Sequence, residues 1–156
     1  MKKARRNSID KLILAYAKKI RLDDPVVKEM KAASRAMQIV KKFNVTHVFI
    51  DDYVEDKRRI YANFCFFGQG YHAEIANPRE KSNEGRQEIF VLSLKKGLSK
   101  VSIQNYENFD LVSANSESRL TVAFYLVNGE SFFLNASGNN CEELIKIYSA
   151  VLKSKL

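Results

Sequence analysis

The sequence contains few of the residues that cross-link or interrupt a small fold. Among its 156 residues are two cysteines, two prolines, six glycines and no tryptophan. Cys65 and Cys141 stand far apart and outside metal-ligand spacing, which favours free thiols in a reducing compartment and predicts a cytoplasmic protein. Apolar runs such as residues 122–127 are far shorter than the ~20 residues that cross a bilayer. The composition therefore argues against a disulfide scaffold and against a transmembrane helix.

Catalytic groups are equally scarce. The two histidines, His47 and His72, each fall on a predicted strand without a partner motif. The chain has no glycine-rich phosphate loop and no nucleophile elbow. One acidic stretch is superficially similar to part of a metal nuclease but is predicted to be a solvated turn; it comprises Asp51, Asp52, Glu55, Asp56 and Lys57. We therefore predict that the chain is not an enzyme and holds no metal and no cofactor.

Positive charge is what the sequence has in excess. The net charge is +8, and the first 43 residues hold 13 Lys and Arg against 4 Asp and Glu, a net +9. The remaining 113 residues hold 13 against 14, a net −1. Such an asymmetry predicts a polyanionic partner, although a solvated helical face gives the same composition. The residues predicted to bind that partner are Lys2, Lys3, Arg5, Arg6, Lys18, Lys19, Arg21, Lys28, Lys31 and Arg35.

The basic segment has the pattern of two helices. Apolar residues recur at helical spacing through residues 9–20, where Ser8 is a candidate N-cap. Asp24 and Pro25 then favour the start of a second helix that runs to about Lys42. The pair resembles a helix-turn-helix without its third member, so nucleic-acid binding by the hairpin and the basic arm is the alternative function. The first helix also has the amphipathic pattern of an interfacial helix, which keeps a membrane surface among the candidate partners.

From Val45 onward the apolar period changes from 3.6 to 2, which predicts an antiparallel sheet. The Asn128-Gly129 pair predicts a type I′ turn, because that turn needs positive φ at both positions. Residues 77–87 form the longest predicted loop. Short strands at this spacing are typical of a barrel or sandwich. The expected strands are residues 45–50, 60–67, 71–76, 88–94, 98–104, 108–114, 120–127 and 130–137.

Aromatic side chains occupy both faces of one predicted hairpin. They are Tyr61, Phe64, Phe66, Phe67 and Tyr71. Two apolar faces favour coverage by the N-terminal helices over an exposed surface that stacks on bases or contacts a protein.

The C-terminal region carries a family resemblance. A capping-box spacing from Asn140 to Glu143 predicts a terminal helix. The stretch SRLTVAFYLVNGESFFLNASGNNCEELIKIYSAVL resembles the last two strands and the helix of bacterial pleckstrin-homology-like domains, and the likeness extends by strand count over residues 45–153. It implies a module that recruits proteins or, in some members, inositol phospholipids, through basic residues between the first strands. The matching secondary basic cluster here is Lys57, Arg58 and Arg59.

These observations predict an α+β fold with two domains. Residues 1–43 form a basic helical hairpin. Residues 44–156 form a strongly bent antiparallel sheet, or pleckstrin-homology-like barrel, of seven to eight strands with a C-terminal helix. The expected function is that of a non-enzymatic intracellular adaptor whose basic helices engage an acidic protein, a nucleoprotein complex or a membrane face. Unpaired sheet edges and the aromatic hairpin are compatible with an oligomer.

Overall fold

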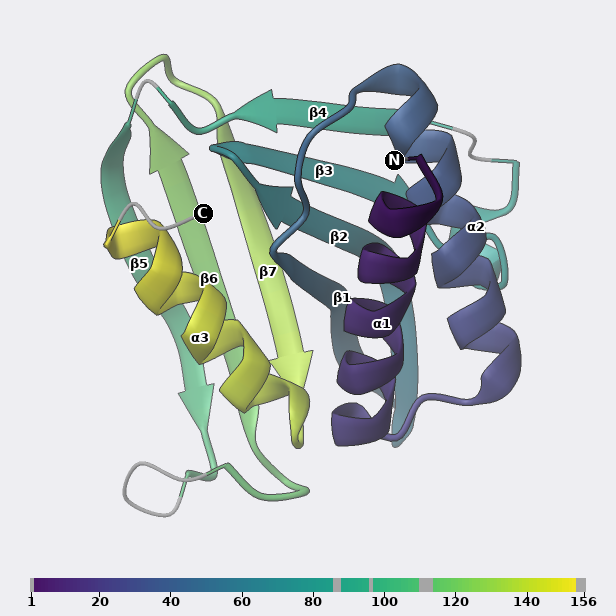
Figure 1. Ribbon diagram of the computed structural model, residues 1–156. Coiled ribbons are helices and arrows are strands. Elements are labelled where there is room, and N and C mark those ends of the chain that lie inside the picture. The colour runs from purple at the N-terminus through teal and green to yellow at the C-terminus, as the bar shows by residue number, and fades with distance from the viewer. Residues whose placement is uncertain (1, 86–87, 96, 110–113, 154–156) are drawn as a thin grey trace.

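The computed structural model describes residues 2–85, 88–95, 97–109 and 114–153. Those residues form three α-helices, seven β-strands and a short 3-10 helix (Figure 1). The helices are α1 (Lys2–Ile20), α2 (Asp24–Val40) and α3 (Asn140–Leu152), and η1 spans Lys81–Asn83. The strands are β1 (His47–Glu55), β2 (Arg58–Gly68), β3 (Tyr71–Ala76), β4 (Ile89–Ser93), β5 (Leu98–Glu107), β6 (Arg119–Leu126) and β7 (Ser131–Ser137).

The strands form two antiparallel sheets. One has the order β1-β2-β3-β4 and the other the order β5-β6-β7, so within each sheet consecutive strands pair. The predicted α+β class, with two N-terminal helices and one C-terminal helix, is confirmed. The described strands do not close into a barrel, because β1 and β7 lie side by side without forming a main-chain ladder. The expected strand at 108–114 falls largely on residues 110–113, which lie outside the described residues.

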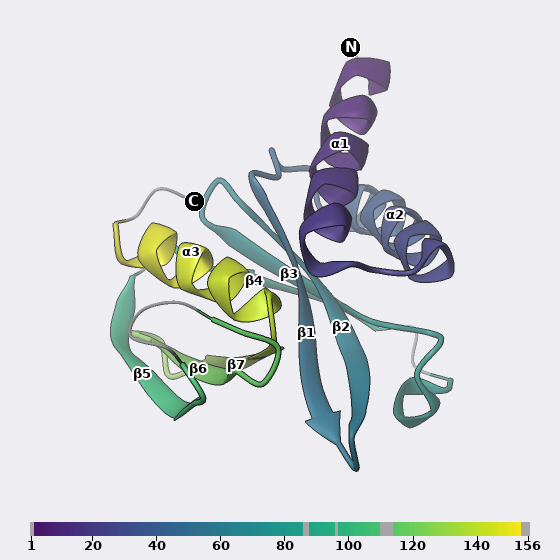
Figure 2. The same cartoon turned by 90° about the horizontal axis from the view of Figure 1, so that it is seen from below.

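The four-stranded sheet is covered on both faces. Figure 2 shows α1 and α2 on one side of it, and α3 with the three-stranded sheet on the other. Four successive residues of β2, from Phe64 to Phe67, have no exposed surface. Successive strand residues point to opposite faces, so both faces are buried here, as the aromatic hairpin predicts. A single cluster of buried apolar side chains runs from Ile9 of α1 to Val151 of α3, across the change of charge near residue 43.

The turn at Asn128-Gly129 differs from the prediction. Gly129 has a φ of 91°, but Asn128 does not have a positive φ. The Gly129 N–H donates to the Leu126 carbonyl at 3.0 Å, and the Leu126 N–H donates to the Glu130 carbonyl at 2.8 Å. This pattern is a three-residue loop with a left-handed glycine, the next most common hairpin connection after the two-residue turns. The prediction of a type I′ turn at this position is therefore wrong.

Two other hairpins have positive φ at both turn residues. Gln69 and Gly70, between β2 and β3, have φ values of 49° and 75°. Asp56 and Lys57, between β1 and β2, have values of 47° and 63°, although neither is glycine. Aspartate tolerates the left-handed region better than most residues, which is consistent with a turn at this position.

Helix ends also differ from the local signals. The first helix begins at Lys2, so Ser8 lies inside α1 and is not its N-cap. Pro25 does lie in the first turn of α2, as expected. Asn140 does not cap α3, because Asn139 holds the N-cap position and the Asn140 side chain is fully buried. A long-range contact has replaced the expected local one.

Two adjacent carboxylates of β1 join the two sheets. The Asp51 carboxylate accepts the Asn135 main-chain N–H at 2.7 Å, and the Asp52 carboxylate accepts the Ser137 main-chain N–H at 3.1 Å. The Ser137 hydroxyl also donates to Asp52, at 2.6 Å. A bulge between Asp51 and Asp52 re-aims the strand, so that both side chains reach β7. These carboxylates are buried in β1 and do not lie in a solvated turn.

The hydrogen bonds at this β1–β7 seam extend to side chains of two helices. The Asn140 amide donates to the Asp52 carboxylate at 2.7 Å and to the Ile50 carbonyl at 2.8 Å. The Tyr16 hydroxyl donates to the Asn140 amide oxygen at 2.6 Å and accepts the Ile50 N–H at 2.7 Å. Burial raises the pKa of Tyr16, so its hydroxyl remains a neutral donor. One buried polar network therefore links α1, β1 and α3.

Arg59 completes this network from β2. Its Nε donates to the Asp52 carboxylate, and its other guanidinium nitrogens donate to the Ser137 and Ile20 carbonyls at 3.4 and 3.5 Å. The Asp52 side chain has no exposed surface, whereas 27% of the Arg59 side chain is exposed. The carboxylate thus has a charged partner and several hydrogen bonds, which offset the cost of removing it from water.

We predict that Asp52→Ala destabilises the fold by about 3–5 kcal/mol, because it leaves Arg59, Asn140 and Ser137 without their acceptor. Urea denaturation at pH 7 measures the change in the free energy of unfolding. The matched control is Glu55→Ala at the exposed end of β1, with an expected change within about 0.5 kcal/mol. Equal effects of the two substitutions would contradict the role assigned to Asp52.

Substitution of Asp51, in contrast to that of Asp52, should stabilise the fold at neutral pH. Burial raises its pKa to about 6, while hydrogen bonds from Asn135 and Asn63 partly oppose that rise. The folded state therefore holds the Asp51 proton more tightly than the unfolded state does. As the pH rises from about 4 to 6, ionisation of Asp51 lowers the free energy of unfolding of the protein. Asp51→Asn keeps an acceptor for Asn135 but cannot ionise. Relative to wild type, this variant should gain up to about 3 kcal/mol between pH 4 and pH 7.

Urea denaturation across that pH range tests the Asp51 prediction. The groups that face Asp51 are Glu74 of β3, whose charge contributes to the raised pKa, and the Cys65 thiol of β2, which burial keeps protonated. A stability difference that stays flat between pH 4 and pH 7 would show that Asp51 titrates at its ordinary pKa.

Candidate anion-binding site

The first group of predicted basic residues lies at the start of α1. The helix begins at Lys2, and its amino end stands clear of the sheets (Figure 2). The side chains of Lys2, Lys3, Arg5 and Arg6 lie outside the described part of the structure. The first turn of the helix contains no acidic residue.

A second group is committed to ion pairs within the molecule. Lys19 of α1 lies 3.8 Å from the Glu143 carboxylate of α3. Arg35 of α2 lies 3.8 Å from the Asp10 carboxylate of α1. In both pairs the cation is more than half exposed, although the carboxylate is not, and the N–O distance is long, so each pair contributes about 0–1 kcal/mol.

A third group has no carboxylate at ion-pair distance within the described residues. It comprises Lys18, Arg21, Lys28 and Lys31. Lys18, Arg21 and Lys28 are exposed, and Lys31 is half-buried. They lie at the end of α1, in the connection to α2 and in the first half of α2. We refer to these four residues as the unpaired cations of α1 and α2.

The secondary cluster does not assemble as one cationic site. Lys57 is exposed at the turn between β1 and β2. Arg58 lies 3.5 Å from the Glu80 carboxylate, and Arg59 points toward Asp52. Of the three residues, Lys57 alone has no carboxylate at ion-pair distance in the part of the chain that the structure describes.

The structure brings together a further basic pair that the sequence analysis missed. The Lys41 ammonium lies 4.8 Å from the centroid of the Tyr71 ring, and the Lys95 ammonium lies 4.6 Å from the same centroid. The Lys95 ammonium also donates to the Tyr71 hydroxyl at 3.3 Å. Phe43 packs against the tyrosine, with ring centroids 5.6 Å apart. The sequence shows a Lys41-Lys42 doublet but has no signal that brings Lys95 beside it.

The Lys41–Tyr71–Lys95 cluster is electropositive. Hydrogen bonds and charge from the two lysines lower the pKa of Tyr71, because they stabilise the phenolate. Neither lysine has a carboxylate at ion-pair distance among the described residues. The cluster therefore offers two ammonium groups and one hydroxyl to an anion.

The groups considered for catalysis lie in other environments. His72 is fully buried between the rings of Phe67 and Phe132, with centroids at 4.6 and 4.3 Å. Burial raises the pKa of the Cys65 thiol and raises that of Cys141 to about 12, so neither is an activated nucleophile. In the described ranges, no group of three or more His, Cys, Asp or Glu side chains could hold a metal ion. No helix within those ranges is long and apolar enough to cross a membrane.

No protein-family model matches the chain, and no curated protein matches it.

The Tyr71 cluster gives a direct spectroscopic prediction. Lys95→Met removes the ammonium that bonds the Tyr71 hydroxyl, so the pKa of Tyr71 should rise toward its ordinary value near 10. Carbon-13 NMR of ring-labelled tyrosines measures each phenol separately. The control is Lys100→Met, because Lys100 lies 5.6 Å from the Tyr125 ring centroid and should leave Tyr71 unchanged. An unchanged Tyr71 pKa in Lys95→Met would contradict the contact.

Proposed function

We propose that this chain is a non-enzymatic binding module that engages an acidic protein partner through basic residues of α1, α2 and their connection. The observation that carries the proposal is the set of unpaired cations of α1 and α2, Lys18, Arg21, Lys28 and Lys31, which have no intramolecular carboxylate to neutralise them in the described structure. They belong to a segment of net charge +9 on a body of net charge −1. Charge concentrated in this way raises the association rate with an anionic partner.

The amino end of α1 also favours an acidic partner. The exposed N–H groups at the amino end of a helix carry partial positive charge, and acidic residues normally stabilise that end. Here the first turn has no acidic residue, while Lys2, Lys3, Arg5 and Arg6 lie in the first turns. The arrangement is unfavourable for the isolated helix by a few tenths to about 1 kcal/mol per charge. Acidic groups of a partner would relieve it.

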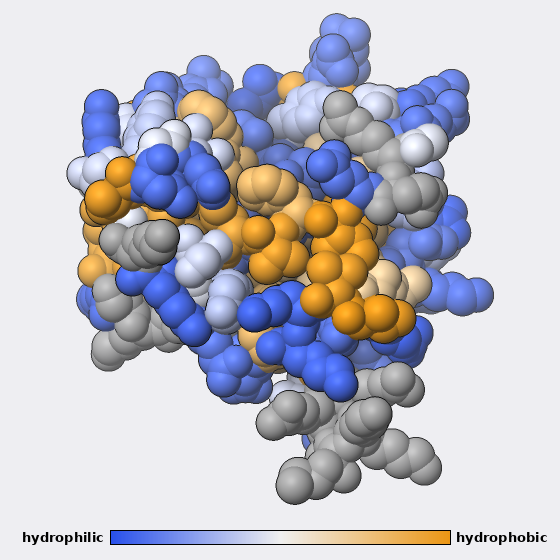
Figure 3. Space-filling view, turned by 90° about the horizontal axis from the view of Figure 1, so that it is seen from above, coloured by the Kyte–Doolittle hydropathy of each residue, from blue (hydrophilic) through white to orange (hydrophobic). Residues whose placement is uncertain are grey.

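Exposed apolar surface on the same two helices favours a protein over a nucleic acid. Ile39 and Val40 at the carboxyl end of α2 are 85% and 58% exposed, and Leu14 of α1 is 50% exposed. Figure 3 views the molecule from the side of the carboxyl end of α2, opposite the α1–α2 connection, and shows an apolar patch bordered by hydrophilic side chains. An apolar centre with a charged rim is typical of protein–protein interfaces, whereas phosphate backbones select continuous positive charge. Asp10 and Glu29 interrupt the positive charge of the helix pair.

A charge-replacement experiment tests the proposal, because the shared core makes removal of α1 and α2 an unsuitable test. The probe is a fluorescein-labelled peptide of alternating glutamate and leucine, and fluorescence anisotropy measures its dissociation constant. We expect affinity to fall at least tenfold when four glutamines replace the unpaired cations of α1 and α2: Lys18→Gln, Arg21→Gln, Lys28→Gln and Lys31→Gln. Binding to wild type should also weaken with added salt.

The control removes the same charge from other surfaces of the protein. Its substitutions are Lys57→Gln, Lys81→Gln, Lys100→Gln and Arg119→Gln, and it should lose less than threefold. Duplex DNA and vesicles with one-fifth phosphatidylserine are measured in parallel. Equal losses in the two variants, or tighter binding of DNA than of the peptide, would overturn an acidic protein partner on α1 and α2.

A further inference from the structure

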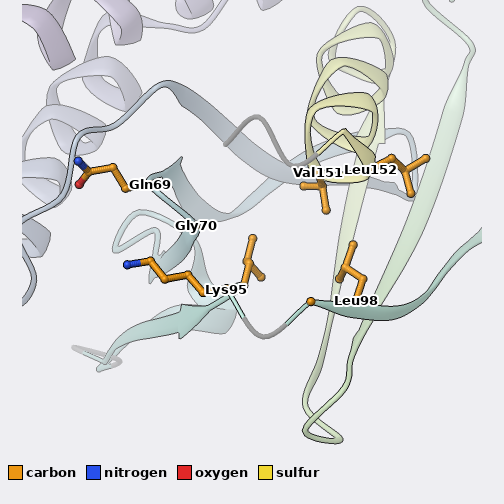
Figure 4. Close-up of a pocket in the computed structure, with 8 residues that line it drawn as sticks. Gln69, Gly70, Lys95, Leu98, Val151 and Leu152 are labelled. Carbon is orange, nitrogen blue, oxygen red and sulfur yellow. The ribbon is translucent and has the colours of Figure 1, made fainter.

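A cavity lies between the two sheets at the end of the molecule that holds the β2–β3 turn. Its volume is about 550 Å³, within the range of small-molecule pockets. Gly70 and Lys95 line one side, and Leu98, Val151 and Leu152 line the other (Figure 4). Leu94 adds a fourth apolar side chain. The cavity therefore combines an aliphatic wall of four side chains with the polar side chains of Gln69 and Lys95.

Gly70 allows Lys95 to connect this wall to Tyr71. A Cβ at Gly70 would lie 2.8 Å from the Lys95 Cγ, and Gly70 has a φ of 75°. With glycine there, the aliphatic stem of Lys95 lies across the turn while its ammonium reaches the Tyr71 hydroxyl. A lysine that buries its stem along apolar surface and keeps its charge at the edge is a common amphipathic arrangement. Lys95 thus belongs both to the cavity and to the Lys41–Tyr71–Lys95 cluster.

The two ammonium groups of the cluster repel each other. Each lies less than 5 Å from the same ring centroid, at 4.8 and 4.6 Å, with no carboxylate at ion-pair distance within the described residues. Attraction to the Tyr71 ring offsets part of this repulsion. A bound anion would offset more, because it would accept hydrogen bonds from both ammonium groups and from the Tyr71 hydroxyl.

We propose that the cavity binds a single-chain amphipathic anion, with its carboxylate or phosphate head on Lys41, Lys95 and Tyr71 and its alkyl chain on the aliphatic wall. The head group explains the convergence of two lysines on one tyrosine. The chain explains why the wall next to those cations is built from Leu94, Leu98, Val151 and Leu152. The proposal goes beyond the acidic protein partner, because it uses a different set of residues from the unpaired cations of α1 and α2.

Isothermal titration calorimetry of the full chain with four probes tests which part of the ligand matters. Decanoate and decyl phosphate, both below their micelle concentrations, carry head and chain. Decanol lacks the charge, and inorganic phosphate lacks the chain. We expect saturable binding of one or both anionic amphiphiles, at least tenfold tighter than decanol or inorganic phosphate. The ratio of decanoate to decyl phosphate affinity identifies the head group. Decanol binding as tight as decanoate, or no saturable binding of either amphiphile, would overturn the proposal.

Variants locate the two ends of the ligand. Lys41→Met and Lys95→Met should each weaken the preferred amphiphile at least fivefold, because they remove charge and keep an aliphatic stem. Lys100→Met is the matched control, since this lysine also lies over a tyrosine ring but does not line the cavity. Leu98→Gln should weaken the amphiphile and leave the pKa of Tyr71 in the free protein unchanged. Equal weakening by Lys95→Met and Lys100→Met would show non-specific charge binding and overturn the site.

Ligand binding should also change Tyr71. A bound anion neutralises the lysines, so the pKa of Tyr71 should rise on saturation with the preferred amphiphile. The tyrosine NMR titration described above detects this change, and thermal melting confirms that each variant is folded. A Tyr71 pKa that is unaffected by a saturating amphiphile would place the head group elsewhere and contradict the assignment.

Discussion

The buried carboxylate of Asp52 is the interaction on which the architecture depends. It accepts hydrogen bonds from Ser137 of β7, Asn140 of α3 and Arg59 of β2, while Asp52 itself belongs to β1. The two sheets share no main-chain ladder at the β1–β7 seam. Side chains therefore replace ladder bonds there, and one charge sets the position of three other elements. Such a charge is tolerable inside a protein because the guanidinium and several donors surround it.

Internal ion pairs also decide which cations are available for binding. Arg59 is held by Asp52, Lys19 by Glu143 and Arg35 by Asp10, so each has an intramolecular role. The sequence does not distinguish Lys19 and Arg35 from Lys18 and Lys28, because a count of charges contains no information on partners. The structure separates them by distance to a carboxylate. Of the 13 cations in the first 43 residues, Lys19 and Arg35 are therefore available to a partner only if an internal ion pair breaks.

Elements with strong periodicity could be predicted from the sequence, whereas residues with long-range partners could not. The apolar stripe through Ile13 and Tyr16 predicts a buried helix face, and both residues are buried. The stripe does not reveal that the Tyr16 hydroxyl bonds to Asn140, which lies near the other end of the chain. Asn140 looks like a capping residue because local spacing is all that the sequence offers. The convergence of Lys41 and Lys95 on Tyr71 also has no local motif in the sequence. It depends on tertiary structure, because Lys41 follows α2 and Lys95 follows β4, which pairs with the strand of Tyr71.

Lys41 relates the helix that carries Lys28 and Lys31 to the Tyr71 cluster. It follows α2 directly, and its N–H donates to the Met37 carbonyl at 2.8 Å, so the end of the helix fixes its main chain. Its side chain reaches Tyr71 on β3, next to the cavity. The unpaired cations lie toward the other end of α2, so an acidic partner would compete for Lys41 with an anionic ligand at Tyr71 only where it extends along the helix to Ile39 and Val40. Since the same charge cannot be neutralised twice, the two ligands would weaken each other, and by linkage the effect would be reciprocal.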